Sequence, residues 1–230
     1  MLYIVSTPIG NLKDKTFRAV EVLKEVDLIA AEDTRHTKIL TQHYNISTSL
    51  TSYFEHNEIK KAEYLLGLLQ EGKTVALVTD AGTPGISDPG YRIIKLAQEN
   101  DIPITVVPGP TALIAALTLS GLPAHSFVFE GFLPVKSSGR RKLLEKLKGE
   151  ERTIIFYESP YRVLKSLKDI EEVLDDPKVV VVRELTKKFE EIRRGKSSEL
   201  AEHFVKTPPK GEFVLLLNLT LRLDSPLSST

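Results

Sequence analysis

The sequence predicts an α/β fold in two domains, and three observations support this. Short runs of β-branched residues alternate along the chain with helical patterns, which is typical of βαβ units and a mostly parallel sheet. Hydrophobic residues make up 41% of the 230 residues, enough for one large or two small compact cores. Gly and Pro in Ser120-Gly121-Leu122-Pro123 predict a turn after a helical segment. We therefore predict domains at 1–119 and 120–222, with a polar tail at 223–230.

The individual elements follow from the spacing of apolar residues. The first half predicts strands at 2–6, 27–31, 50–54, 74–79 and 104–107, and helices at 16–24, 34–44, 58–70 and 111–119. The second half predicts strands at 127–130, 152–157, 179–183, 191–195 and 213–221, and helices at 140–148, 161–174 and 198–204. Several strands of the second half can run antiparallel. We therefore expect a parallel sheet in the N-terminal domain and a mixed sheet in the C-terminal domain.

Composition excludes several classes of function. The chain has no Cys, so a disulfide framework, a Cys-based zinc site and a catalytic thiol are all excluded. No apolar stretch approaches the roughly 20 residues of a membrane span, and we expect a cytoplasmic protein. Lys plus Arg and Asp plus Glu both number 31, so the neutral chain creates no overall field for nucleic acid and RNA contacts must be local. His43, His56, His125 and His203 have no ligand spacing, and no metal site is predicted.

Residues 67–74 match the phosphate-binding pattern G-x-x-x-x-G-K-T letter by letter. A true phosphate loop follows a strand and opens a helix, so that backbone amides and the helix N-terminus point at phosphate. Here the predicted order is the reverse, because a helix ends at Gln70 and a strand begins at Thr74. We therefore interpret Gly72 as a helix C-cap and reject nucleotide binding there.

The loop from Asp80 to Gly90 is rich in Gly, Pro and Asp, and it follows an apolar strand. Ligands of open α/β sheets bind outside the carboxyl ends of strands. The loop contains two Asp and no Lys or Arg, so it is poorly suited to bind pyrophosphate. The same composition suits a cationic ligand, such as a sulfonium cofactor with ribose hydroxyls. Alternatively, it is a rigid surface loop in which Asp88 caps the following helix. Two similar loops, at 6–12 and 107–112, end other strands, and three such loops at one edge would form a cleft.

Two groups of charged residues allow two interpretations each. Glu32, Asp33, Arg35 and His36 stand at the end of the second strand, where ionisable groups commonly face a site. Alternatively, Asp33 caps the next helix and its neighbours form a solvated face. Similarly, a stretch with an excess of positive charge is either a surface that binds the RNA backbone or an ordinary solvated helix face. It comprises Lys136, Arg140, Arg141, Lys142, Lys146 and Lys148, opposed by Glu145.

Five segments together resemble a known family. Residues 4–10, 28–35, 80–90, 107–112 and 183–187 look like those of the ribosomal RNA small subunit methyltransferase I family, a branch of the tetrapyrrole methylase superfamily. The resemblance runs to about residue 220. It implies a two-domain tetrapyrrole-methylase fold with a cofactor cleft between the domains, S-adenosyl-L-methionine as cofactor, and a homodimer. It also implies 2'-O-methylation of a cytidine ribose in 16S ribosomal RNA.

Two other classes of function remain as alternatives. A small-molecule methyltransferase acting on a tetrapyrrole would share the cofactor loops, but it does not explain the Glu32-Asp33-Thr34-Arg35 segment or the basic stretch. A binding module without catalysis would not need cofactor loops and ionisable groups together.

The patterns in the sequence and the resemblance together give the expected site residues. For proton abstraction we favour the acidic pair Glu32 and Asp33, with Arg35 holding phosphate or carboxylate, while His36 and Lys187 remain further candidates. The expected cofactor-binding residues are Pro8, Gly10, Asp80, Ala81, Gly82, Thr83, Ile86, Pro108, Thr111, Ala112, Tyr157 and Glu184. The expected RNA-binding residues are Lys136, Arg140 and Arg141.

Overall fold

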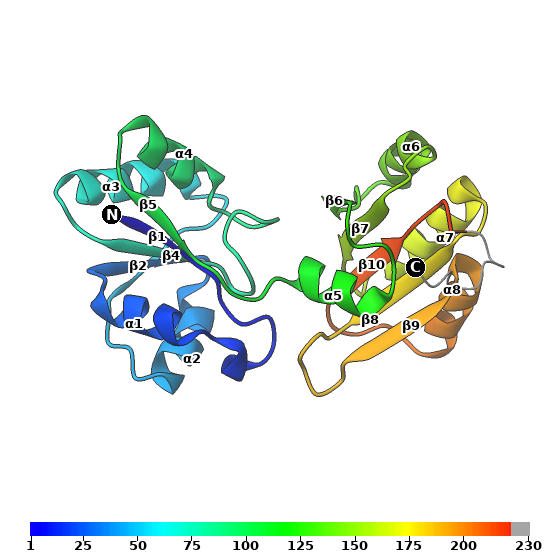
Figure 1. Ribbon diagram of the computed structural model, residues 1–230, viewed down its shortest axis with the longest axis horizontal. Coiled ribbons are helices and arrows are strands. Elements are labelled where there is room, and N and C mark those ends of the chain that lie inside the picture. Colours follow the sequence, from blue (N-terminus) through cyan, green and yellow to red (C-terminus); the bar gives the residue numbers. More distant parts are fainter. Residues whose placement is uncertain (222–230) are drawn as a thin grey trace. The chain divides into compact units, whose positions relative to one another are not determined.

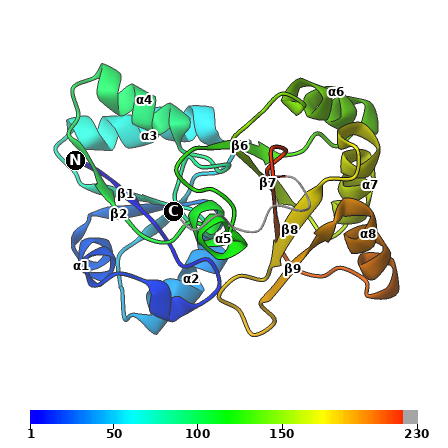
Figure 2. The same cartoon turned by 45° about the vertical axis from the view of Figure 1, so that its right-hand side comes forward.

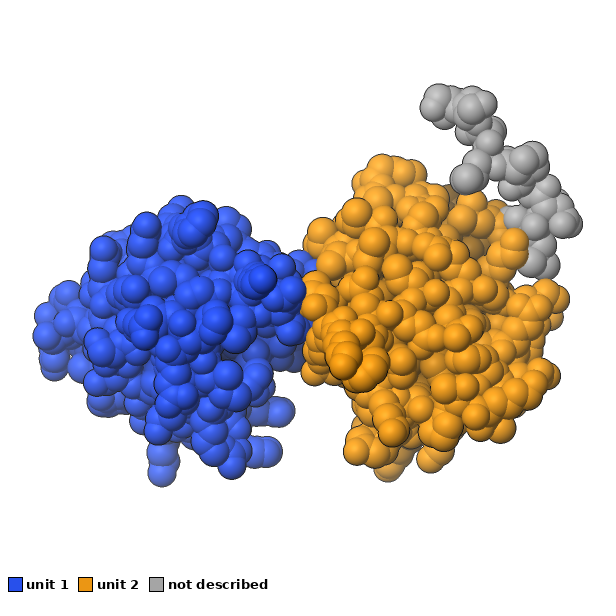
Figure 3. All heavy atoms as spheres, turned by 90° about the horizontal axis from the view of Figure 1, so that it is seen from below, with its two compact units in different colours: residues 1–111 blue, residues 112–230 orange. Residues whose placement is uncertain are grey.

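The computed structural model describes residues 1–221 and divides the chain into two compact units. Unit 1 comprises Met1–Thr111 and unit 2 begins at Ala112 (Figure 3). The predicted tail at 223–230 lies outside the described residues. The division falls before the helix at Ala112–Ser120, whereas the sequence places it after residue 119, because this helix packs on strands of unit 2.

Unit 1 is built on a parallel sheet of five strands in the order β3-β2-β4-β1-β5 (Figure 1). Every neighbouring pair is parallel; Ile4, for example, stands opposite Leu77 on one side and Val106 on the other. The strands are β1 (Leu2–Val5), β2 (Leu28–Ala31), β3 (Leu50–Ser52), β4 (Val75–Val78) and β5 (Ile104–Val107). All the strands of this sheet therefore end at the same edge.

Helices cover both faces of this sheet because successive strand residues point to opposite sides. On one face, Val5 and Val78 pack with Leu23 and Leu40; on the other, Leu77 packs with residues of two further helices. In Figures 1 and 2, α1 and α2 lie on one side of the sheet, and α3 and α4 on the other. The helices are η1 (Leu12–Asp14), α1 (Phe17–Glu25), α2 (Thr34–His43), α3 (Glu58–Gln70) and α4 (Tyr91–Glu99).

Unit 2 contains a mixed sheet in the order β6-β7-β10-β8-β9, as the sequence predicts. β6 and β7 are parallel, and the other neighbouring pairs are antiparallel. The strands are β6 (Phe127–Phe132), β7 (Thr153–Glu158), β8 (Lys178–Arg183), β9 (Glu191–Lys196) and β10 (Phe213–Leu217). β10 ends before the predicted residue 221, because the Asn218 side chain accepts hydrogen bonds from the amide and hydroxyl of Thr220 and turns the chain.

One face of this sheet is covered by three helices, which share a core with it. Leu144, Leu167 and Phe204 pack with Phe156 and Leu215 of the strands. The helices are α6 (Ser137–Leu147), α7 (Val163–Leu174) and α8 (Ser197–Lys206), while α5 (Ala112–Ser120) contacts β7, β8 and β10. None of the helices within residues 1–221 combines the length and apolar character that a membrane span requires.

The segment that resembles a phosphate loop connects a helix to a strand. α3 ends at Gln70, and Gly72 adopts a φ of 84°, a left-handed conformation that glycine accepts without strain. The amides of Gly72 and Lys73 donate to the carbonyls of Leu69 and Leu68, at 3.1 and 3.0 Å. These bonds close the C-terminus of the helix. The predicted helix-to-strand connection is confirmed, and no helix N-terminus is available there for phosphate.

Candidate active site

Unit 1 gathers its strand-end loops at one edge of the sheet. β4 lies between β2 and β1, so the loop that follows Val78 is flanked by the loops that follow Ala31 and Val5. The loop after β5 lies next to that of β1, because the two strands pair. Binding sites of open parallel sheets form at this edge.

The loop after β1 and the loop after β4 are bonded to each other. Thr7 and Gly82 exchange backbone hydrogen bonds, with N to O distances of 2.8 and 3.1 Å, and the Thr7 hydroxyl donates to the carbonyl of Thr79 at 3.0 Å. The hydroxyls of Ser6 and Thr83 are 2.8 Å apart. Gly82 has a φ of 93°, which requires glycine or strain. The two loops therefore form one rigid surface.

The loop after β5 joins the same surface through a close backbone approach. A Cβ atom added to Gly109 would lie 2.8 Å from the Cβ of Ser6, so only glycine fits without displacement. The predicted cofactor residues of unit 1 stand on these three loops: Pro8, Gly10, Asp80, Ala81, Gly82, Thr83, Ile86, Pro108 and Thr111. Ala112, Tyr157 and Glu184 belong to unit 2.

Asp80 is at the centre of a polar cluster between the ends of β2 and β4. Its amide donates to Oε2 of Glu32 at 3.2 Å, and its own Oδ1 accepts from the amide of Asp33 at 3.2 Å. Glu32 also accepts a short hydrogen bond from the Thr79 hydroxyl. Burial, and then the negative charge of Glu32, raise the pKa of Asp80 above its usual value.

His36 approaches the same carboxylate from α2. Its Nδ1 atom lies 3.5 Å from Oδ1 of Asp80, and its side chain is half exposed. In a histidine whose Nδ1 faces a carboxylate, Nε2 is the nitrogen left for other partners. The imidazole of His36 and the carboxylate of Asp80 thus face each other at the end of β4.

Asp33 caps the N-terminus of α2, which was one of the two interpretations that the sequence allowed. Its carboxylate accepts from the amide of Arg35 at 2.8 Å and binds the Arg35 guanidinium, with Nη2 at 2.6 Å from Oδ2. Hydrogen bonds from that side chain and that amide hold the pKa of Asp33 far below its usual range. A carboxylate so stabilised is a poor proton acceptor, and Arg35 is already paired with it.

Lys15 is a site neighbour that the sequence reasoning missed. Its Nζ donates to the carbonyl of Ser6 at 2.8 Å, at the base of the loop after β1. Burial lowers the pKa of Lys15 to about 8, so its positive charge is weakly held. Nothing in the local sequence signals this, because the run Leu12-Lys13-Asp14-Lys15 has the composition of a solvated turn.

In unit 2, the predicted site residues Glu184 and Lys187 are paired with each other. Nζ of Lys187 lies 3.0 Å from Oε1 of Glu184 and 2.9 Å from Oε2 of Glu212. Burial disfavours the charge of Lys187, but hydrogen bonds to Glu212 and Glu184 outweigh it and raise the pKa of the lysine. These pairs favour the charged form of Lys187, and its predicted part in proton transfer stays a prediction.

Tyr157, another predicted site residue of unit 2, binds the start of α5. Its hydroxyl accepts a hydrogen bond from the amide of Leu113 at 3.1 Å.

The residues expected to bind RNA differ in exposure, and Arg140 is not at the surface. This side chain is buried, with the residue only 3% exposed, and its Nε pairs with Oδ2 of Asp169 at 2.7 Å. Arg141 is partly exposed and pairs with Glu172 and Asp169, while Lys136 is exposed. The charge pattern of α6 alone could not reveal Asp169, which comes from the neighbouring helix α7.

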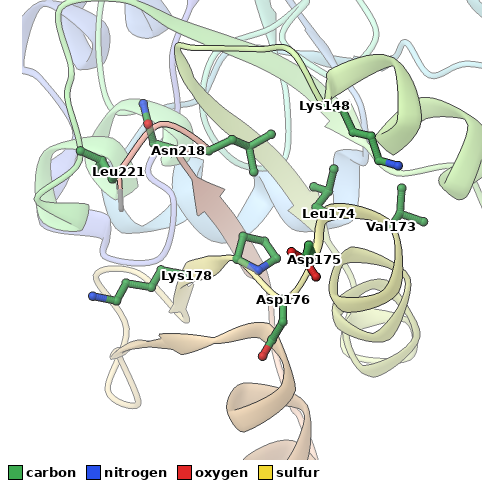
Figure 4. A pocket seen from close by; sticks show the side chains of 10 residues that line it. Lys148, Val173, Leu174, Asp175, Asp176, Lys178, Asn218 and Leu221 are labelled. Carbon is green, nitrogen blue, oxygen red and sulfur yellow. The ribbon is translucent and has the colours of Figure 1, made fainter. Parts of the chain in front are cut away.

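Unit 2 also contains a pocket of about 650 Å³, whose lining includes Leu174, Asp176, Lys178 and Asn218 (Figure 4). It lies at the start of β8 and the end of β10, the opposite edge from Glu184. Lys148 of the basic stretch lines it, but none of the predicted catalytic or cofactor-binding residues does. The strand-end loops therefore remain the candidate site.

Comparisons with known proteins agree with this fold and sequence pattern. Residues 1–201 match the family model described as Tetrapyrrole (Corrin/Porphyrin) Methylases. Ribosomal RNA small subunit methyltransferase I of Thermotoga maritima is 50% identical over 217 residues, which cover 94% of this chain and 97% of that protein. The protein of the same name from Escherichia coli O157:H7 is 53% identical over 220 residues, covering 94% and 77% respectively.

Solved structures with lower identity share the fold. The methyltransferase CobJ has a TM-score of 0.72 at 18% identity, with 97% of this chain and 96% of that chain covered. Uroporphyrin-III C-methyl transferase from Thermus thermophilus, solved in complex with S-adenyl homocysteine, has a TM-score of 0.66 at 21% identity, with 95% and 97% covered. S-adenosylmethionine is the cofactor of this methyltransferase family. The chain therefore belongs to the tetrapyrrole methylase family and, within it, to the proteins named ribosomal RNA small subunit methyltransferase I.

Proposed function

We propose that this protein uses S-adenosylmethionine to methylate a cytidine ribose of small-subunit (16S) ribosomal RNA at its 2'-hydroxyl. The observation that carries the proposal is the joined surface at the end of the first sheet, where the acidic loop at Asp80 is bonded to the loop after β1 through Thr7 and Gly82. The name shared by relatives with about half identical residues supports ribosomal RNA as the substrate.

The residues of this surface suit the cofactor by their chemistry. Between Thr79 and Gly90 the loop offers carboxylates, hydroxyls and backbone carbonyls and has no Lys or Arg. A sulfonium group and ribose hydroxyls are bound by such acceptors. We assign cofactor binding to Asp80 and to the backbone of Ala81, Gly82 and Thr83. When bound, S-adenosylmethionine supplies a methyl group that a nucleophilic oxygen can take.

We assign proton acceptance to His36 rather than to the acidic pair favoured on sequence grounds. Asp33 is a capped and ion-paired carboxylate, and Glu32 is occupied by Thr79 and the Asp80 amide. His36 is half exposed and faces Asp80 through Nδ1, which leaves Nε2 for a ribose hydroxyl. A general base of this kind typically contributes a rate factor of roughly 10² to 10⁴. Asp80 orients the imidazole, and Glu32 holds the backbone of Asp80.

Other parts of the chain have supporting roles in this proposal. Arg35 holds the Asp33 carboxylate and so fixes the start of α2, which carries His36. Lys136 and Arg141 remain candidates for phosphate contacts, whereas Arg140 is not one. We further propose that the enzyme acts in the cytoplasm, where ribosomal RNA is found, and that it works as a homodimer.

The decisive experiment measures methyl transfer from labelled S-adenosylmethionine to three substrates: small ribosomal subunits, free small-subunit RNA and a precorrin-type tetrapyrrole. We expect label in the RNA, and nuclease digestion with mass spectrometry should place it on a cytidine ribose. Transfer to the tetrapyrrole alone would favour the small-molecule enzyme. Cofactor binding without any transfer would favour a binding module.

A further inference from the structure

Two aromatic side chains project from neighbouring loops of unit 2. Phe132 ends β6 and is 52% exposed, and Tyr161 follows β7 and is 89% exposed. β6 and β7 run parallel, so their carboxyl ends lie at the same edge of the second sheet. A register shift between Phe129 and Phe132, with Gly131 at a φ of 66°, redirects the end of β6. Two exposed aromatic side chains are thus on adjacent loops at one edge of the sheet, whereas exposed hydrophobic residues of soluble proteins are usually scattered singly.

Arg162 connects the two loops and fixes their geometry. Its Nη1 donates to the carbonyl of Leu133 at 3.1 Å, and its Nη2 pairs at 2.7 Å with Oε1 of Glu158, whose side chain is fully buried. The guanidinium carbon lies 5.8 Å from the centre of the Phe132 ring. The ring of Tyr157 meets the Phe132 ring edge-on, with centres 5.7 Å apart. Phe132 is therefore held in place before any ligand arrives, which reduces the entropy lost on binding.

The charges around these rings favour a polyanion. Segments 131–136 and 158–165 carry the cations Lys136, Arg162 and Lys165 and a single carboxylate, Glu158. Glu158 is buried and paired with Arg162, so its charge is compensated, whereas Lys136 and Lys165 are exposed. Exposed aromatic rings among cations are the arrangement that binds single-stranded nucleic acid, because bases stack on the rings and phosphates meet the cations.

We propose that Phe132 and Tyr161 form a stacking surface for unpaired bases of single-stranded RNA, with Lys136 and Lys165 contacting the adjoining phosphates. The inference rests on the proposed function for the class of substrate, and it identifies the residues of unit 2 that hold the RNA. Stacking uses the face that every base has, so this surface supplies affinity without reading sequence. The sequence pattern pointed instead to α6, where Arg140 is buried.

The test uses the full chain and an unstructured hexaribonucleotide that contains 2-aminopurine, whose fluorescence falls when the base stacks. We expect Phe132→Ala and Tyr161→Ala each to weaken binding by roughly fivefold to a hundredfold and to reduce the quenching. Phe132→Trp should retain binding, whereas Phe132→Leu, apolar but without an aromatic face, should not. The matched control is Tyr64→Ala in unit 1, a half-exposed aromatic with Lys61 at 5.0 Å from its ring centre, which should bind normally.

Two further readouts separate this inference from the proposed function. S-adenosylmethionine affinity, measured by calorimetry, should be the same in all variants, which also shows that they are folded. Unchanged RNA affinity and quenching in both alanine variants would overturn the stacking surface, even if ribosomal RNA is methylated normally. Weakened binding in these variants, in a protein that methylates no RNA, would support the surface and refute the proposed reaction.

Discussion

The Nδ1 atom of His36 lies 3.5 Å from the Oδ1 atom of Asp80, although the two residues come from different elements and are far apart in the sequence. The adjacent strands β2 and β4 bring them together, because both strands end at the same edge of the sheet. The amide of Asp33 donates to the Asp80 carboxylate, and the backbone amide of Asp80 donates to Glu32, so both the side chain and the backbone of Asp80 are held. This relationship is the basis of the proposed mechanism.

If His36 accepts the proton, His36→Ala should lower single-turnover methylation by roughly 10²-fold or more, while calorimetry shows unchanged cofactor affinity. Asp80→Asn should lower both the methylation rate and the cofactor affinity, because the proposal also assigns cofactor binding to Asp80. His43→Ala is the matched control, since His43 is exposed on the same helix. Normal turnover in His36→Ala would move the proton acceptor elsewhere in the cluster.

Asp33→Asn separates a cap from a base. Asn caps a helix about as well as Asp, so methylation should be nearly unchanged. The carboxylate should matter for stability instead. Its pKa is lower in the folded state, so its contribution is present above the unfolded pKa of about 3.9 and is lost as the pH falls through the folded pKa. Urea unfolding should therefore show wild type more stable than the variant at pH 7, with the difference shrinking below about pH 4. A large loss of turnover would restore Asp33 as the base.

Gly109→Ala tests whether the loops after β1 and β5 act as one surface. The added Cβ would lie 2.8 Å from the Cβ of Ser6, so one loop must move, at a typical cost of about 1 to 3 kcal/mol. We expect cofactor affinity to fall about tenfold. Gly149→Ala is the control, because nothing lies within 4 Å of its added Cβ. Equal affinity in both variants would separate the β5 loop from cofactor binding.

Arg140→Ala should destabilise unit 2 rather than weaken RNA binding. Removing one partner of a buried ion pair typically costs about 3 to 5 kcal/mol. Asp169 would keep Ser137 and the partly exposed Arg141 as partners, so we expect a loss toward the lower end of that range. The double variant Arg140→Met/Asp169→Leu should recover much of that loss. Urea unfolding measures both. In contrast, Arg141→Ala should flatten the salt dependence of RNA binding by about one unit if it contacts a phosphate. A stable Arg140→Ala with weak RNA binding would contradict this assignment.

The spacing of apolar residues predicted the strands and helices of this protein from the sequence alone. The helix at Glu58–Gln70 and the strand at Ile104–Val107 have the predicted bounds, because apolar spacing and flanking Gly and Pro are local signals. The loops after β1, β4 and β5 were also recognisable, since their Gly and Pro residues meet local backbone requirements, as at Gly82. Family resemblance then added the cofactor and the class of reaction.

The tertiary structure decided which charged groups are free to act. Asp33 and Arg35 neutralise each other, Lys187 is held by Glu184 and Glu212, and Arg140 is buried against Asp169. The sequence shows which residues carry charge. Whether a charged side chain can bind a ligand or accept a proton depends on its burial and its ion-pair partners, and such a partner often comes from another element. The approach of His36 to Asp80 and the placement of Phe132 beside Arg162 likewise depend on strand order, which the pattern of elements does not specify.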